Sequence, residues 1–201
     1  IGGYVNATKS IQLDGSITAG SRGTGTIGEY SIVVGGPEQS LGFPTASVAS
    51  GKYSVSFGAG NISSNTGSMT FGGGNISSGL FSFAIGANNI SSGNMSVAIG
   101  SGNTVSGSNT TVTGKGNIAY GKQSAIIGGT GNMLTIDAMN SAIIGGTAIS
   151  ATQPNTVYVP NLVSTGNVGL GVEIPTEKLD VNGNANIRGY LYVQNGVIIG
   201  R

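Results

Sequence analysis

Bulky apolar and small residues alternate within a five-residue motif that recurs through the middle of the chain. Its first six copies are SVSFG, SMTFG, SFAIG, SVAIG, TTVTG and SAIIG, and their closing glycines stand 14 residues apart, at positions 58, 72, 86, 100, 114 and 128. A seventh copy, SAIIG at residues 141–145, follows after 17 residues. The spacing therefore predicts a 14-residue repeat, with three residues inserted near residues 135–139.

The alternation places bulky and small side chains on opposite faces of a short strand. One row holds bulky pairs such as Phe83 and Ile85, and the other holds small residues such as Ser82 and Ala84. Because apolar side chains are usually buried, we expect the bulky row to fill the interior and the small row to let another backbone approach. From Val112 onward the small row becomes apolar, so we expect either that both faces are buried there or that the packing changes.

Two further sets of residues keep the same step and are typical of corners. They are Gly51, Gly79, Gly93, Gly107 and Gly121, and Asn61, Asn75, Asn89, Asn103 and Asn117. Gly and Asn tolerate positive φ at low cost, so each repeat is predicted to form two short strands joined by two sharp corners. Such repeats stack into an all-β fold, a parallel β-solenoid (β-roll). A flexible Gly/Ser linker would not keep Val, Ile and Phe in phase over six turns.

Charge is scarce along the whole chain and absent from its regular part. Only 7% of the 201 residues are charged, whereas about 25% is usual, and residues 54–114 contain no charged side chain. A soluble monomer normally covers its exterior with charged residues, and a thin solenoid is nearly all exterior. We therefore expect coils from several chains to pack as a parallel homotrimer, intertwined or side by side.

The same composition excludes several classes of partner and site. A net charge of +1 offers no basic footprint for nucleic acid, and no apolar run approaches the roughly 20 residues of a membrane span. The absence of Cys and His removes disulfides and the usual zinc ligands. The sequence begins at Ile1 rather than Met, so we expect it to be a piece of a longer polypeptide.

Two glycine-rich motifs resemble nucleotide-binding loops, and we reject both. GTGTIG at residues 23–28 matches a dinucleotide fingerprint, but nothing after Gly28 has a helical pattern. GNIAYGKQ at residues 116–123 lacks the Ser or Thr that would hold Mg²⁺. Glu173 and Glu177 are the closest pair of glutamates, and a solvated loop is favoured over a glycosidase pair. We therefore expect no enzyme, and no catalytic, cofactor-binding or metal-binding residue.

The chain divides into three expected regions. Residues 1–50 hold the degenerate copies SITAG and YSIVVG and an insert with two prolines, and residues 51–150 hold the regular repeats. Residues 151–201 regain charge and are predicted to form a small β cap or connector, with strands at residues 176–181 and 185–193. Tyr190 and Tyr192 suit either stacking on a sugar or packing between chains, and the second is favoured.

The SVAIG unit at residues 96–100, followed by G-x-N and repeated every 14 residues, resembles the head repeat of YadA-like trimeric autotransporter adhesins. The resemblance covers residues 51–150. Heads of that family are trimers of left-handed parallel β-rolls, so the resemblance implies a trimeric β-roll. No membrane anchor and no long heptad stalk stand in this segment, which departs from the pattern of that family.

The tail is similar to segments of bacteriophage tail-fibre proteins over residues 155–193, through NTVYVPN, GNVGLG and PTEKLDVNG. In such proteins these segments often lie just before a C-terminal intramolecular chaperone domain, which this sequence does not contain. Neither resemblance brings catalytic residues with it. Both imply a trimeric shaft or head that projects from a surface and contacts a host.

The leading hypothesis from the sequence is a structural segment of a trimeric phage tail fibre or virion appendage that attaches to a host. Its expected partners are two further copies of the chain, a host receptor or glycan, and other fibre proteins, at the virion surface or outside the cell. The alternatives are a bacterial trimeric adhesin head and, more remotely, an ice-binding solenoid, for which Thr111 and Thr113 form the one T-x-T pair in the regular array. Corner loops at residues 62–65 and 103–106 are candidate contact sites by position.

Overall fold

The computed structural model describes residues 17–19, 27–35 and 46–190, the first of these ranges as backbone only. Within these ranges every regular element is a β-strand: there are 20 strands and no helix. The chain separates into two compact units, and the boundary in the sequence lies between Pro160 and Asn161. The predicted all-β fold is therefore confirmed.

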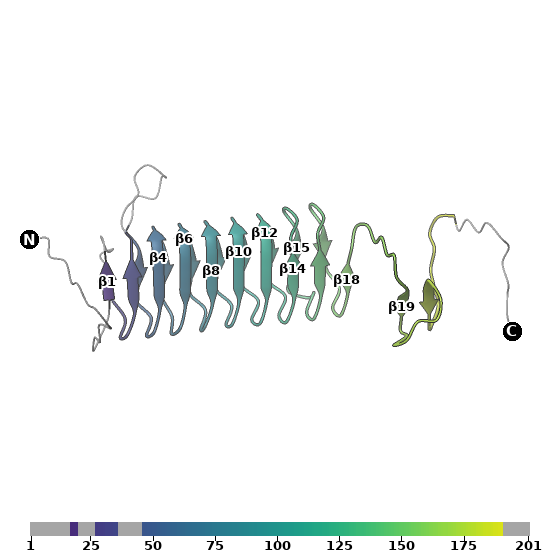
Figure 1. Ribbon diagram of the computed structural model, residues 1–201, viewed down its shortest axis with the longest axis horizontal. Coiled ribbons are helices and arrows are strands. Elements are labelled where there is room, and N and C mark those ends of the chain that lie inside the picture. Colours follow the sequence, from purple (N-terminus) through teal and green to yellow (C-terminus); the bar gives the residue numbers. More distant parts are fainter. Residues whose placement is uncertain (1–16, 20–26, 36–45, 191–201) are drawn as a thin grey trace, which may run out of the picture. The chain divides into compact units, whose positions relative to one another are not determined.

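The first unit is a parallel β-solenoid in which every coil contributes one strand to a ten-stranded sheet, the first sheet (Figure 1). The strands follow chain order along this sheet and all pair in parallel. They are β1 (Ile17–Ala19), β2 (Ile32–Val34), β4 (Val55–Ala59), β6 (Met69–Gly73), β8 (Phe83–Ala87), β10 (Val97–Ser101), β12 (Thr111–Lys115), β14 (Ala125–Ile127), β16 (Ala142–Ile144) and β18 (Val157–Tyr158).

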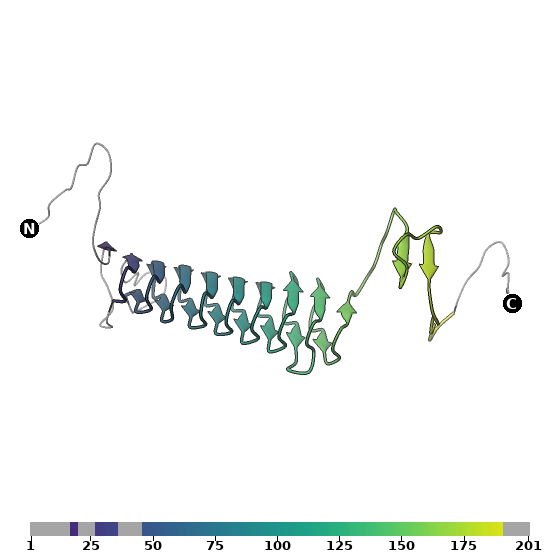
Figure 2. The same cartoon turned by 90° about the horizontal axis from the view of Figure 1, so that it is seen from below.

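Shorter strands form the second sheet, which runs alongside the first (Figure 2). It has eight strands, again parallel and in chain order. They are β3 (Val48–Ala49), β5 (Ile62–Ser63), β7 (Ile76–Ser77), β9 (Ile90–Ser91), β11 (Thr104–Val105), β13 (Ile118–Ala119), β15 (Met133–Leu134) and β17 (Ser150–Ala151). The chain passes from the first sheet to the second at a first corner, and returns at a second corner. Each repeat thus has the two strands and two corners that the sequence predicts.

Equivalent repeat positions align from coil to coil. The degenerate copies belong to the same array, because Ile32 pairs with both Ile17 and Val55. The insertion of three residues is divided between two corners: Met133 follows Ala125 by eight residues and Ala142 follows Met133 by nine, whereas each step is seven residues in a regular coil. The prediction that all three residues lie near residues 135–139 is therefore wrong for one of them, which lengthens the first corner.

The recurring glycines serve two different physical needs. Gly86 has φ +115°, and a Cβ there would lie 2.0 Å from the backbone oxygen of Gly100 in the next coil. Gly79 does not have a positive φ, yet its Cβ would also lie 2.0 Å from a backbone oxygen, that of Gly93. The expectation that the glycines of the second corner supply positive φ is therefore wrong. They are needed because adjacent backbones approach too closely for any side chain.

The small residues, not the bulky ones, fill the interior of the coils, so the predicted orientation of the two rows is wrong. Thr70 and Ala84 have no exposed surface, whereas Phe71 is 37% exposed and points outward. The interior is narrow: the Ser63 hydroxyl on the second sheet donates a 2.7 Å hydrogen bond directly to the Val55 carbonyl of the first sheet. Only small side chains fit between sheets this close.

The interior changes from polar to apolar along the solenoid. In the N-terminal coils it holds hydroxyl pairs, such as Ser77 and Ser82, whose oxygens are 2.6 Å apart. In the C-terminal coils it is a hydrophobic cluster that includes Val112, Ile126 and Leu134, all fully buried. The coil that contains Ile126 and Leu134 is also the one lengthened by the insertion, so its added backbone encloses larger side chains. Of the two alternatives predicted from residue 112 onward, the change of packing is confirmed, and burial of both faces is wrong because Ile127 is 49% exposed.

A ladder of buried asparagines closes the first corner. Its members are Asn61, Asn75, Asn89, Asn103, Asn117 and Asn132, and none has exposed surface. The Asn89 amide nitrogen donates to the carbonyls of Ile85 and Gly100, each at 2.9 Å. The side-chain oxygen of each asparagine accepts the backbone N–H of the next. The ladder therefore satisfies buried backbone groups that the sharp corner leaves outside the sheets.

The second unit contains the parallel strand pair β19 (Val168–Leu170) and β20 (Leu179–Val181). The strand predicted at residues 176–181 is confirmed only in its second half. Residues 185–190 form no strand, residues 191–193 lie outside the described residues, and β19 was not predicted. The solenoid itself runs on to β18, past the boundary expected at residue 150.

Candidate interaction surface

The outward side of the first sheet presents a ladder of bulky apolar side chains, which we call the apolar face. Its two rows are Val55, Met69, Phe83 and Val97, and Phe57, Phe71, Ile85, Ile99, Ile127 and Ile144. The parallel register stacks like on like, so the Phe57 and Phe71 rings lie 5.5 Å apart and within 6° of parallel. The second row remains more than one-third exposed throughout. Water therefore contacts an apolar strip, interrupted at β12 by Thr111 and Thr113, that the hydrophobic effect favours covering.

The second sheet carries its own outward apolar row. It consists of Ile62, Ile76, Ile90, Ile118 and Met133, with Thr104 as the polar exception. Ile62 and Ile90 are both 38% exposed. Each coil thus presents two separate apolar surfaces, one on each sheet.

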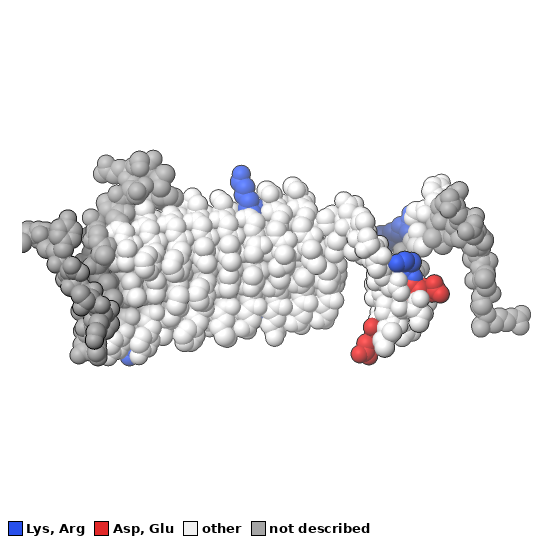
Figure 3. Space-filling model, viewed as in Figure 1, with Lys and Arg blue, Asp and Glu red and all other residues white. Residues whose placement is uncertain are grey.

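Charged side chains are confined to strand ends and corners. Among residues 27–35 and 46–160 they are Glu29, Lys52, Lys115, Lys122 and Asp137. None of them belongs to the outward rows of either sheet. In the view of Figure 3 the solenoid is white apart from blue atoms at its edges. Neither apolar surface therefore carries a like charge that would repel another copy of the chain.

The second corner of each coil holds one residue with a left-handed backbone, and the row of these residues is chemically unusual. The φ values are 51–57° for Tyr30, Tyr53, Phe81 and Met95, each about half-exposed. A residue with a side chain is disfavoured there by about 1–2 kcal/mol. At the first corner the matching positive-φ position holds Gly, Asn or Ala, as in Gly74. Bulky apolar groups therefore occupy a strained and exposed position on one edge only.

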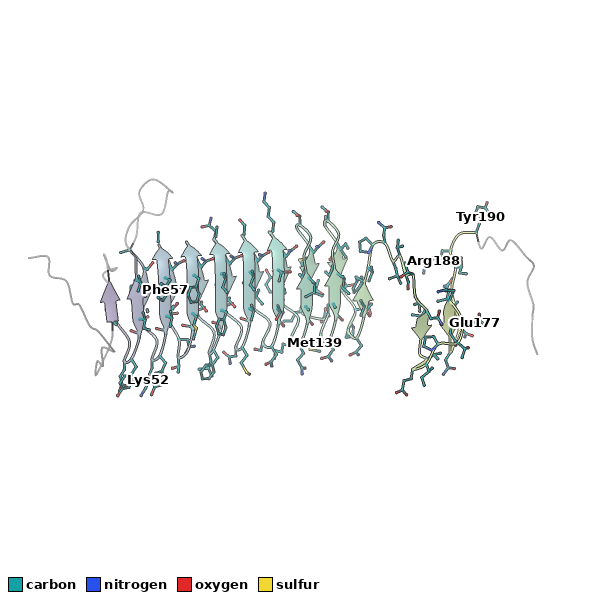
Figure 4. All side chains as sticks on the ribbon, in the orientation of Figure 1. Lys52, Phe57, Met139, Glu177, Arg188 and Tyr190 are labelled. Carbon is teal, nitrogen blue, oxygen red and sulfur yellow. The ribbon has the colours of Figure 1, made fainter. Side chains whose placement is uncertain are left out.

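Tyr30 and Tyr53 form the most organised part of this edge. Their rings are parallel within 11° and their centroids are 5.3 Å apart. Because rings in face-to-face contact are about 3.5–4 Å apart, these two are offset sideways, which leaves part of each face open. The Lys52 ammonium lies 5.7 Å and 5.2 Å from the two centroids, within the range of cation–π attraction. In Figure 4, Lys52 and Met139 lie along the same lower edge of the solenoid.

An ion pair holds Lys52 in place beside the rings. Its ammonium lies 2.9 Å from the Glu29 carboxylate. This hydrogen bond lowers the pKa of the Glu29 carboxyl below its usual 4.5, and it raises the pKa of Lys52 above 10.5. Both groups are solvent-exposed, so the pair contributes little to stability.

The corner loops proposed from the sequence are less exposed than expected. Ser63 is a buried residue of β5, and Asn103 and Val105 have no exposed surface. The expectation that residues 62–65 and 103–106 are exposed loops is therefore wrong for these residues. Ser63 and Val105 point inward from the second sheet, and Asn103 belongs to the buried asparagine ladder of the first corner.

The other candidate residues are not brought together into a site. Tyr190 is fully exposed in the second unit, and Tyr192 lies outside the described residues. Glu173 and Glu177 are both exposed in that unit, outside its strands. Gly28 is followed by β2 rather than a helix, and Gly116–Gln123 spans β13 and a corner. Neither glycine-rich motif thus meets the helix N-terminus that a nucleotide loop requires.

Sequence reasoning missed both the outward direction of the bulky row and the edge of left-handed residues. The second feature had a signal in the sequence, because a large residue directly precedes the first small residue of several copies, as in Tyr53, Phe81 and Met95.

No helix among the described residues is long and apolar enough to cross a membrane. The described ranges also contain no group of three or more Asp and Glu residues placed to hold a metal ion. Comparison of the sequence with models of known protein families and with curated proteins finds no match.

Proposed function

We propose that this chain is a structural segment of a fibre that projects from a surface, and that it works as a parallel homotrimer. One observation carries the proposal: the apolar face is exposed and uncharged along its length, and only β12 interrupts it with threonines. A coil this narrow has no interior room for Phe57, Phe71 or Ile85, and the described part of the chain leaves them more than one-third exposed, so another chain is the cover we propose.

The presence of two separate outward apolar surfaces, one on each sheet, favours an assembly of three chains over an assembly of two. In a twofold dimer each chain uses one self-complementary surface, whereas a threefold ring joins two different surfaces of each chain. The apolar face of one chain and the second-sheet row of the next supply two such surfaces. The second unit supports the same proposal, because Leu162, Val163 and Ile174 are all more than two-thirds exposed there.

The setting we propose is a phage tail fibre or related virion appendage that attaches to a host surface, with other fibre proteins as neighbours. The motifs at residues 155–193 support it through their resemblance to tail-fibre segments. A bacterial trimeric adhesin head is the second candidate, which the SVAIG repeat supports. An ice-binding role has one outward T-x-T pair in its favour, Thr111 and Thr113, which we consider too little for a flat ice-binding array.

The test of the assembly is the mass in solution, measured by light scattering during size-exclusion chromatography, before and after boiling. We expect three times the 19.8 kDa chain mass before boiling. Ile85→Lys places a charge at the centre of the apolar face, so it should yield smaller species. Ala87→Lys is the matched control, since it lies on the same strand and β12 already carries Lys115 at that position.

A folded wild-type monomer at micromolar concentration would contradict the trimer. An Ile85→Lys variant that keeps the wild-type mass would show that the apolar face is not the contact surface. The choice between virion and bacterial settings is tested with antibodies raised against this chain, which should label purified virions and not the bacterial outer surface.

A further inference from the structure

The left-handed residues of the second corner form one unbroken row along the solenoid, with one member in each coil. In chain order the row is Tyr30, Tyr53, Gly67, Phe81, Met95, Asn109, Gln123, Asn140 and Asn155. Its N-terminal half consists of three aromatic residues, one glycine and one methionine, and its C-terminal half consists only of carboxamide residues. We call this row the second-corner row.

The bulky members of this row are not explained by the fold. The same backbone conformation is filled by Gly67 and by three asparagines, which tolerate it best. The Phe81 ring folds back over Gly67, where an added Cβ would lie 2.3 Å from the ring. The Phe81 ring therefore covers the one position of the row that has no side chain. Strain retained at exposed positions points to a binding role.

The backbone of this row offers no place for a peptide strand to pair. The N–H groups of Tyr53, Phe81 and Met95 each donate to a carbonyl in the preceding coil, at 2.8–3.0 Å. The same holds for Asn109, Gln123 and Asn155. β-strand addition, in which a peptide uses free backbone groups, is therefore excluded along this edge. A ligand must bind through the side chains.

The side chains suit a neutral sugar polymer. Partly open aromatic faces pack against the C–H faces of pyranose rings, and carboxamides both donate to and accept from hydroxyl groups. The row members are uncharged, and the Lys52 ammonium beside the first two rings is paired with the Glu29 carboxylate, which favours a neutral polymer over an acidic one. They recur once per coil, about 4.8 Å apart, which is comparable to the length of one sugar residue in an extended chain.

We propose that the second-corner row is a binding site for a neutral polysaccharide that lies along the solenoid axis. The rings hold the N-terminal part of the ligand and the carboxamides hold the rest. This inference rests on the proposed host-contact function, for which it supplies the ligand, although the site lies within a single chain.

The test uses the full chain on a printed array of dextran, laminarin, mannan, xylan and purified bacterial surface polysaccharides, with matrix proteins as additional spots. The key variant is Tyr30→Asn/Tyr53→Asn/Phe81→Asn, because asparagine keeps the left-handed backbone and removes the rings. We expect the wild type to bind at least one neutral polysaccharide, and the triple variant to bind it at least tenfold more weakly. Its melting temperature should equal or exceed that of the wild type.

Two further variants serve as controls that should retain binding. Asn88→Gly changes a left-handed residue at the opposite corner and should bind as the wild type does. Phe81→Tyr keeps a ring and should also retain binding. If the triple variant unfolds, the single variant Phe81→Asn decides, and a several-fold loss is expected from it.

Failure to bind any polysaccharide, binding confined to the protein spots, or full binding by a folded triple variant would each overturn the inference. So would a triple variant that loses stability and binding in proportion, since the rings would then be structural. The mass in solution is measured on the same samples. A trimer that binds no sugar contradicts this inference alone, and a monomer that binds sugar contradicts only the proposed assembly.

Discussion

The side-chain oxygen of Asn75 accepts a 3.0 Å hydrogen bond from the backbone N–H of Asn89, exactly one repeat later in the chain. Each asparagine side chain thus forms hydrogen bonds with backbone groups of its own coil and the next one, at a corner where those backbone groups do not pair with each other. The ladder begins at the Ser47 hydroxyl, which accepts from Asn61, and it ends where Ile149 donates to Asn132. The Ile149 side chain has no hydrogen-bonding group, so the ladder ends at this residue.

Replacing Asn89 with alanine should be strongly destabilising. The substitution leaves the Ile85 and Gly100 carbonyls and the Asn103 N–H without their partner inside the protein. Each unsatisfied buried group costs about 1–3 kcal/mol, so we expect a loss of at least about 3 kcal/mol in the free energy of unfolding. Denaturant titration at fixed protein concentration measures it. Asn94→Ala, at an exposed corner, is the control and should cost less than about 1 kcal/mol; equal losses would contradict the ladder's role.

Two glycine-to-alanine substitutions should separate backbone strain from backbone collision. Gly116 has φ +62° with nothing within 4 Å of an added Cβ, so Gly116→Ala should cost about 1–2 kcal/mol. Gly86→Ala adds a collision with the Gly100 oxygen and should cost several kcal/mol more or prevent folding. Thermal unfolding of the two variants side by side tests this difference. Similar melting temperatures would mean that adjacent coils separate easily.

The polar-to-apolar gradient of the interior predicts that the C-terminal coils are the more stable part of the solenoid. Burial of Ile126, Leu134 and Ile143 supplies hydrophobic stabilisation that serine and threonine pairs do not. Hydrogen–deuterium exchange should therefore show slower amide exchange for residues 118–145 than for residues 54–80. As a check, Ile126→Ala should lose about 2–5 kcal/mol. Uniform protection, or slower exchange at the N-terminal end, would contradict the prediction.

The Glu29–Lys52 pair predicts a small pH dependence with a known sign. Because the pKa of Glu29 is lowered on folding, its contribution is present above pH 4.5 and is lost as the pH falls through the folded value. Because the pKa of Lys52 is raised, its contribution is present below pH 10.5 and is lost as the pH rises through the folded value. The melting temperature of Glu29→Gln should therefore fall less below pH 4.5 than that of the wild type. If the melting temperatures of the variant and the wild type fall by the same amount as the pH is lowered, the pair does not contribute to stability.

Much of this protein follows from the sequence alone. The 14-residue step of the closing glycines and of Asn61 to Asn117 was enough to predict parallel strands, two corners per repeat and an all-β solenoid, because a side chain that recurs at a fixed step must stack in a column. The scarcity of charge adds the prediction that another chain covers the exterior, which the mass in solution tests. None of these predictions depends on which side of a strand faces inward.

The tertiary structure alone decided that direction. Alternation defines two faces of a strand, but hydrophobicity assigned the wrong face to the interior. The two sheets of a 14-residue coil lie so close together that the side chain of Ser63 reaches from one to the backbone of the other. Thr70 and Ala84 therefore lie inside, and Phe71 and Ile85 face outward. The row of left-handed residues from Tyr30 to Met95 emerged in the same way, since its members become neighbours only when the coils stack.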